Sequence, residues 1–136
     1  MTLTDEAISK GKVLRTENGR AIFAPAGANY EHHMEAPTYA GPIGKPVRVV
    51  LRAKARKIYS MPSGGAFVTP ILGTPRIIQG RVMTLDETSV TIHGGGARFV
   101  VELPTGKDTV DLQAGAIGVG SFVNAVVLPG ATLELA

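Results

Sequence analysis

Residues 47–58 read VRVVLRAKARKI, a stretch in which apolar and basic side chains alternate. Successive side chains of a β-strand point to opposite faces, so the alternation predicts a strand with one apolar face and one basic face. Val50 interrupts the basic side. Over its full length the basic row would extend about 27 Å along a strand. Its four members are Arg48, Arg52, Lys54 and Arg56.

Charge is distributed unevenly around this strand. The chain has 14 Lys and Arg against 11 Asp and Glu, but residues 36–85 hold only cations and no acid. Such a row can neutralise a polyanion such as nucleic acid, whose binding weakens steeply with salt. It is also typical of a solvated strand face, so both interpretations stay open. The nearest aromatic ring, Tyr59, falls on the apolar side, and a stacking platform beside the cations is missing unless a bulge reverses it.

The rest of the chain also favours β-structure. Asn18-Gly19 lies between two extended segments and predicts a hairpin with a type I′ turn. A second hairpin is predicted over residues 81–93, and a further alternating strand over residues 97–103. The only helix that we expect is a short one at the N-terminus, with Thr2 or Thr4 as its cap and Gly11 as its stop.

Two parts of the sequence resemble each other, and they indicate an internal repeat over residues 11–58 and 80–133. At an offset of 69, residues 11–34 align without gaps with residues 80–103. The offset then becomes 74, which matches Val49 with Val123. Chance similarity between hairpins would explain the match about as well as duplication. The four identities of the first segment are Gly11/Gly80, Val13/Val82, Gly27/Gly96 and Ala28/Ala97.

These patterns predict one all-β domain over residues 1–136. We expect a small barrel or sandwich of about eight strands, OB-like or internally duplicated, with at most one short N-terminal helix. The repeat alignment would make the basic face of one half correspond to an apolar face of the other, so a homo-oligomer is predicted. The aligned pairs are Arg48/Phe122, Arg52/Val126 and Lys54/Leu128.

The segment NYEHHME at residues 29–35 is the one cluster with metal-binding or acid–base potential. In a strand, Glu31, His33 and Glu35 share one face and offer carboxylate and imidazole ligands. His32 points the other way. Because it aligns with Val101, which we predict to face inward, we expect a partly buried imidazole that needs a hydrogen-bond partner.

Several classes of function are disfavoured by what the sequence lacks. It has no Cys, which excludes thiolate catalysis, disulfides and Cys-ligated zinc, and it shows neither a nucleophile elbow nor a nucleotide P-loop. We expect no cofactor and lean against an enzyme. Residues 1–11 do not resemble a signal peptide, and the uncharged residues 112–133 are broken by Gly and Pro, so we predict a cytoplasmic protein without a membrane partner.

Three hypotheses for the function follow. The first is a non-catalytic binding or assembly module, contacting a polyanion or nucleic acid through the basic strand. The second is a metal-binding protein or metal-dependent enzyme that uses Glu31, His33 and Glu35. The third is a structural subunit of a larger homo-oligomeric or phage-like assembly.

Overall fold

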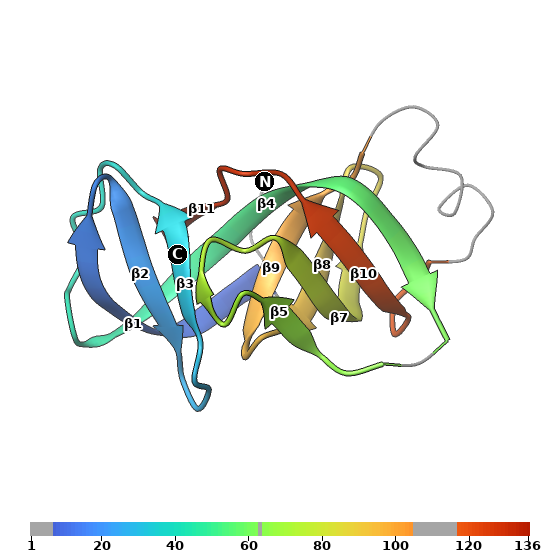
Figure 1. The fold of residues 1–136 in the computed structure, drawn as a ribbon, viewed down its shortest axis with the longest axis horizontal. Helices are drawn as coiled ribbons and strands as arrows, with labels where there is room; N and C mark the ends of the chain where they lie inside the picture. Colours follow the sequence, from blue (N-terminus) through green and yellow to red (C-terminus); the bar gives the residue numbers. More distant parts are fainter. Residues whose placement is uncertain (1–6, 63, 105–116) are drawn as a thin grey trace.

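The computed structural model describes residues 7–62, 64–104 and 117–136. The described residues form β-strands and no α-helix, which confirms the all-β class (Figure 1). Accordingly, none of them lies in a helix long and apolar enough to cross a membrane. The strands are β1 (Ile8–Glu17), β2 (Arg20–Pro25), β3 (Glu31–Glu35), β4 (Pro46–Met61), β5 (Phe67–Thr69), β6 (Leu72–Gly73), β7 (Ile77–Leu85), β8 (Ser89–Gly94), β9 (Ala97–Glu102), β10 (Phe122–Val127) and β11 (Thr132–Leu135).

The strand pairings close into two rings that share β4. The first ring runs β1-β2-β3-β11-β4 and closes where β4 pairs with β1. The second runs β4-β10-β7-β8-β9 and closes where β9 pairs with β4. β4 is 16 residues long, and Figure 1 shows it crossing the molecule from one ring to the other. The described strands, eleven in all, therefore close into two rings side by side, where the sequence predicts one barrel or sandwich of about eight strands.

Both predicted hairpins are present. Asn18 and Gly19 have φ values of 52° and 77°, as a type I′ turn requires, and Glu17 lies opposite Arg20. The turn from β7 to β8 is held instead by Asp86, whose carboxylate accepts hydrogen bonds from the backbone N–H groups of Thr88 and Ser89, each at 2.8 Å. These backbone donors lower the pKa of Asp86 below its ordinary value, since they stabilise the carboxylate.

The expected N-terminal helix is wrong for the residues that the structure describes. Ile8, Ser9 and Lys10 belong to β1, where Ile8 pairs with Val50 of β4. The Ser9 side chain is buried and exchanges hydrogen bonds with the backbone of Arg98 in β9. Pairing with strands distant in sequence thus overrides the local capping signal. Residues 1–6 of the expected helix lie outside the described residues.

The two halves share a local distortion. The register of β1 against β2 shifts between Val13 and Arg15, and that of β7 against β8 shifts between Val82 and Thr84. The offset of 69 places the first shift on the second. A β-bulge bends its strand and increases the local twist. The register shifts therefore lie at equivalent positions of β1 and β7.

A pair of matched glycines lies beside these bulges. A side chain at Gly11 would meet the carbonyl oxygen of Ala24, and one at Gly80 would meet that of His93. Ala24 and His93 are also separated by 69 residues. Glycine at both positions allows the first two strands of each half to approach closely.

The fourth strands are equivalent at a different offset from the one that the sequence predicts. Gly11 pairs with Val47 in β4, and Gly80 pairs with Val123 in β10. The equivalence is therefore Val47 with Val123, two residues away from the predicted match of Val49. A shift by two keeps every side chain on its face. Duplication stays a prediction, and these correspondences are the features that it would explain.

The two halves of the predicted repeat each contribute part of their last strand to the ring of the other half. Residues 51–54 of β4 pair in parallel with β9, and Thr132 of β11 pairs in parallel with Glu35 of β3. The buried apolar side chains accordingly form one cluster that runs through both rings. Each ring therefore includes a strand that the other half supplies, and a single domain over residues 1–136 stays a prediction.

Candidate functional site

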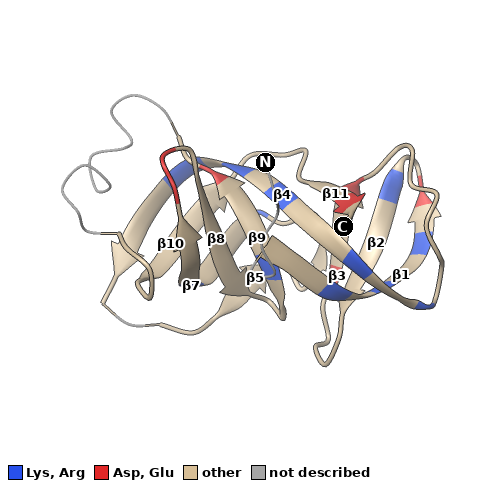
Figure 2. Ribbon diagram, turned by 180° about the vertical axis from the view of Figure 1, so that it is seen from behind, with Lys and Arg blue, Asp and Glu red and all other residues tan. Residues whose placement is uncertain are grey.

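The four cations predicted on β4 do not form one continuous row. Val49, Val50 and Leu51 are all fully buried, so both faces of β4 are covered where it passes between the rings. This burial separates Arg48 from the other three. Figure 2 shows the basic residues distributed along the full length of β4.

The middle of the predicted row faces acidic residues. Arg52 Nε donates to Glu134 Oε1 of β11 at 2.6 Å, and the two side chains are 39% and 55% exposed. Lys54 lies next to Glu102 of β9 in the register. Carboxylates beside both cations reduce the potential that an incoming anion would meet.

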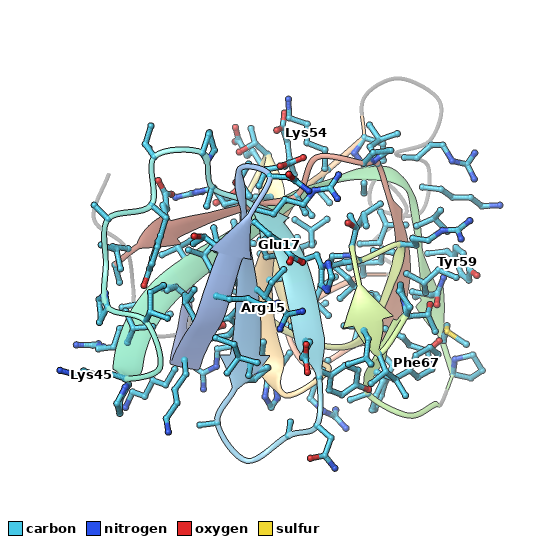
Figure 3. All side chains as sticks on the ribbon, turned by 60° about the vertical axis from the view of Figure 1, so that its left-hand side comes forward. Arg15, Glu17, Lys45, Lys54, Tyr59 and Phe67 are labelled. Atoms are coloured by element: carbon cyan, nitrogen blue, oxygen red, sulfur yellow. The ribbon has the colours of Figure 1, made fainter. Side chains whose placement is uncertain are left out.

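A bulge near Arg56 reverses the alternation toward the end of β4. Lys57 pairs with Val126 and Ala55 with Val127, so Arg56 is the extra residue. Beyond it, Lys57 and Tyr59 share the outward side, and Lys57 Nζ lies 5.6 Å from the centre of the Tyr59 ring. The ring that the sequence places on the apolar face is therefore beside a cation. In Figure 3, Tyr59 lies far from Lys45, which precedes the other end of β4.

The first part of β4 lines a groove with β1 and β2. Its cavity has a volume of about 610 Å³. We call it the β1–β4 groove. Its lining residues are Lys10, Gly11, Lys12, Ala24, Pro25, Ala26, Gly27, Pro46, Val47 and Arg48.

The charged residues that line the β1–β4 groove are all basic. They are Lys10, Lys12 and Arg48. Lys10 and Arg48 are direct cross-strand partners. Lys10 and Lys12 are two residues apart on one strand, roughly 7 Å along its axis. Neither lysine forms an ion pair with a described residue.

Sequence reasoning missed the two lysines of this groove. Residues 10 and 12 flank Gly11, which we interpreted as a helix stop, and they lie more than 30 positions before Arg48. The available signal was the alternation of lysine, glycine and lysine at residues 10–12, which is compatible with a strand. Only the pairing of β1 with β4 brings these cations together.

A second cavity, of about 620 Å³, lies at the junction of the two rings and has charged and hydroxyl-bearing residues in its lining. Arg52 and Lys54 line it together with the acids Asp86 and Glu102, so its formal charges balance. Its hydroxyl-bearing residues are Thr84, Thr88, Ser89, Thr91 and Thr132. The Asp86 carboxylate is already used by the turn from β7 to β8. This cavity therefore lacks the one-sided charge of the β1–β4 groove.

Glu31, His33 and Glu35 share one face of β3, as predicted, but each acid lies beside an arginine. The Glu31 carboxylate is 3.5 Å from Arg15, and the Glu35 carboxylate is 3.5 Å from Arg20. Within the described ranges, no three His, Cys, Asp or Glu side chains form a group that could hold a metal ion. Along an extended strand the two acids are roughly 13 Å apart, so they do not converge on one ion.

His32 faces inward, as predicted, but it is fully buried rather than partly buried, and it connects the two rings. Its Nε2 lies 3.2 Å from the carbonyl oxygen of Gly95, so Nε2 carries the proton and donates it. The ring stacks on Tyr30 and meets the edge of Phe99, with centroid distances of 5.3 and 5.2 Å. Its Nδ1 is buried without a partner among the described residues. Burial lowers the pKa of His32 to about 4, so the imidazole is neutral at pH 7.

Comparison with known proteins returns one structural similarity. No model of a known protein family matches the chain, and neither does the sequence of any curated protein. A solved structure that resembles it is that of the cytoplasmic molybdate-binding protein ModG, with molybdate bound. The similarity covers 100% of both chains with a TM-score of 0.49 and 18% sequence identity.

Proposed function

We propose that this protein is a non-catalytic binding module that takes an anionic ligand in the β1–β4 groove. The observation that carries the proposal is the charge of the groove. Of the residues that the structure describes, three cations and no acid line it. The junction cavity has a similar volume, but its charges balance, so it offers an anion less attraction.

The positive charges on the neighbouring strands β1 and β4 favour an anion at this position. Like charges that face each other across two strands are destabilising, and Lys10 faces Arg48. Lys12 adds a third positive charge on the same strand as Lys10. An anion beside Lys10 and Lys12, which form no ion pair with a described residue, would gain charge-assisted hydrogen bonds from their ammonium groups. All three cations are exposed, so we expect the affinity to fall as the ionic strength rises.

This proposal narrows the polyanion hypothesis for β4. Of the predicted row, Arg48 lines the groove, while Arg52 is paired with Glu134 and Arg56 lies at the bulge. The predicted homo-oligomer stays a prediction, which light scattering across a range of protein concentrations would test.

Binding of inorganic tripolyphosphate, followed by amide chemical shifts in nuclear magnetic resonance, tests the proposal. The double variant K10Q/K12Q should weaken binding at least tenfold at low salt, since it removes two of the three charges. The matched control R56Q/K57Q removes two cations at the other end of β4 and should bind as the wild type does. Equal affinities for the wild type and K10Q/K12Q would refute the groove as the site. Weakening by R56Q/K57Q alone would assign the anion to the surface around Tyr59.

A further inference from the structure

We infer that the ligand of the β1–β4 groove is a small organic anion, with one anionic head and an apolar body, rather than an inorganic ion or a nucleic acid. This inference rests on the proposed function and concerns the same site. The chemistry of the lining other than its charge identifies the class of ligand. Two features carry the argument, namely the size of the cavity and the lack of neutral polar side chains.

The cavity is much larger than an anionic head needs. Its volume of about 610 Å³ is of the size that proteins use for whole small molecules, typically about 300–1,000 Å³. The cations occupy one part of its lining, on β1 and β4. The remaining space is therefore available to the part of the ligand that carries no charge.

That remaining space offers contacts for carbon and little else. Among the described residues that line the groove, none has a hydroxyl, carboxamide, imidazole or aromatic side chain. The Ala26 N–H, which could have served a ligand, is donated to the Lys10 carbonyl at 3.0 Å. The non-glycine neutral residues of the lining are Ala24, Pro25, Ala26, Pro46 and Val47.

These neutral lining residues, which we call the floor of the groove, discriminate between classes of anion. A sugar or a nucleoside would lose hydration of its hydroxyl groups without finding partners, which disfavours its binding. The bases of a nucleic acid would also find no aromatic ring to stack on among the described residues of this groove. An aliphatic body would gain from burial against the alanine and proline side chains and the methylene stems of Lys10 and Lys12. The junction cavity differs in having five hydroxyl-bearing residues in its lining.

Titration with methyl phosphate and hexyl phosphate separates the apolar body from the head, because the two probes carry the same anionic group. The amide signals of Gly11, Ala26 and Gly27 would report on binding in the groove. Hexyl phosphate should bind about tenfold more tightly than methyl phosphate, which corresponds to burial of roughly 60 Å² of apolar surface. The charge variant K10Q/K12Q should weaken both probes, and R56Q/K57Q should weaken neither.

A floor variant tests the apolar contact without a change of charge. A24S places a hydroxyl on the half-buried floor and should reduce the preference for hexyl phosphate while methyl phosphate binds as before. Equal affinities of the two phosphates in the groove would overturn this inference and leave the proposed function standing. If neither phosphate nor tripolyphosphate shifts the groove signals, the proposed function fails as well. Tighter binding of hexyl phosphate that K10Q/K12Q does not affect would place the apolar contact elsewhere and overturn the inference.

Discussion

Lowering the pH from 7 to 4.5 should destabilise the folded protein through His32. The pKa of this imidazole is lowered from 6.5 to about 4. Burial is the largest cause, and the positive charge of His33 also lowers the pKa, whereas the hydrogen bond to the Gly95 carbonyl raises it. Between pH 6.5 and about pH 4 the unfolded chain binds a proton at His32 that the folded protein does not. The stabilisation is therefore complete above about pH 6.5 and is lost as the pH falls toward 4. At about 1.36 kcal/mol for each pKa unit, the full loss is roughly 3 kcal/mol.

Urea denaturation of the wild type and of H32Q at several pH values between 7 and 4.5 measures this effect. Glutamine keeps a donor for the Gly95 carbonyl but does not titrate, so the free energy of unfolding of H32Q should depend far less on pH. The lowered pKa of Asp86 acts in a separate window, because its contribution is lost only as the pH falls below about 3.8. H93Q is the control for the loss of a histidine as such. Equal losses of stability in the wild type and H32Q between pH 6.5 and 4.5 would refute the reasoning.

Two further predictions concern packing at the starts of the strands. G11A and G80A should each destabilise the protein by about 2–3 kcal/mol in urea denaturation, because the added methyl group meets a backbone carbonyl oxygen. G118A, where a side chain meets open space, should change stability little, and equal effects at all three positions would contradict the close approach. S9A removes the two hydrogen bonds to the backbone of Arg98 and should cost about 1–2 kcal/mol, whereas an unchanged stability would mean that β1 and β9 are held by other contacts.

The sequence was most informative where the fold depends on neighbouring residues. Asn18-Gly19 fixes its hairpin because two consecutive positive φ values are needed within the turn itself. The alternation in residues 47–58 likewise predicts a strand from its own side chains. The N-terminal segment is the contrary case. Its capping pattern is local, but Ile8 and Ser9 are fixed by contacts with Val50 and Arg98, and no local pattern contains those contacts.

The closure of two rings could not be predicted for a similar reason. It depends on β4 leaving one ring and pairing in parallel with β9 of the other. The run VVL at residues 49–51 was the available signal, because consecutive buried residues indicate a strand that is covered on both faces. We interpreted Val50 as an interruption of a basic face. It marks the place where β4 passes from ring to ring.

The candidate site also combines a residue that the sequence predicts with residues that only the fold brings together. Arg48 was predicted from its own strand, but its neighbours Lys10 and Lys12 are brought to it by the register of β1 against β4. Conversely, the expected contribution of Arg52 is reduced by Glu134, which is 82 residues away. A pattern on one strand therefore identifies which side chains face outward. It does not identify which charges they meet.

The shared strand β4 explains why a row of cations in the sequence becomes separate surfaces in the fold. A strand that serves two rings must turn different parts of its length toward different neighbours, and each neighbour sets the local potential. Glu134 of β11 and Glu102 of β9 flank its middle, whereas the lysines of β1 flank its beginning. The proposed function accordingly places the anion at the β1–β4 groove rather than elsewhere on β4. The salt dependence of binding should accordingly correspond to about three cations in one place, and a dependence that also responds to R56Q/K57Q would indicate a ligand long enough to follow the whole strand.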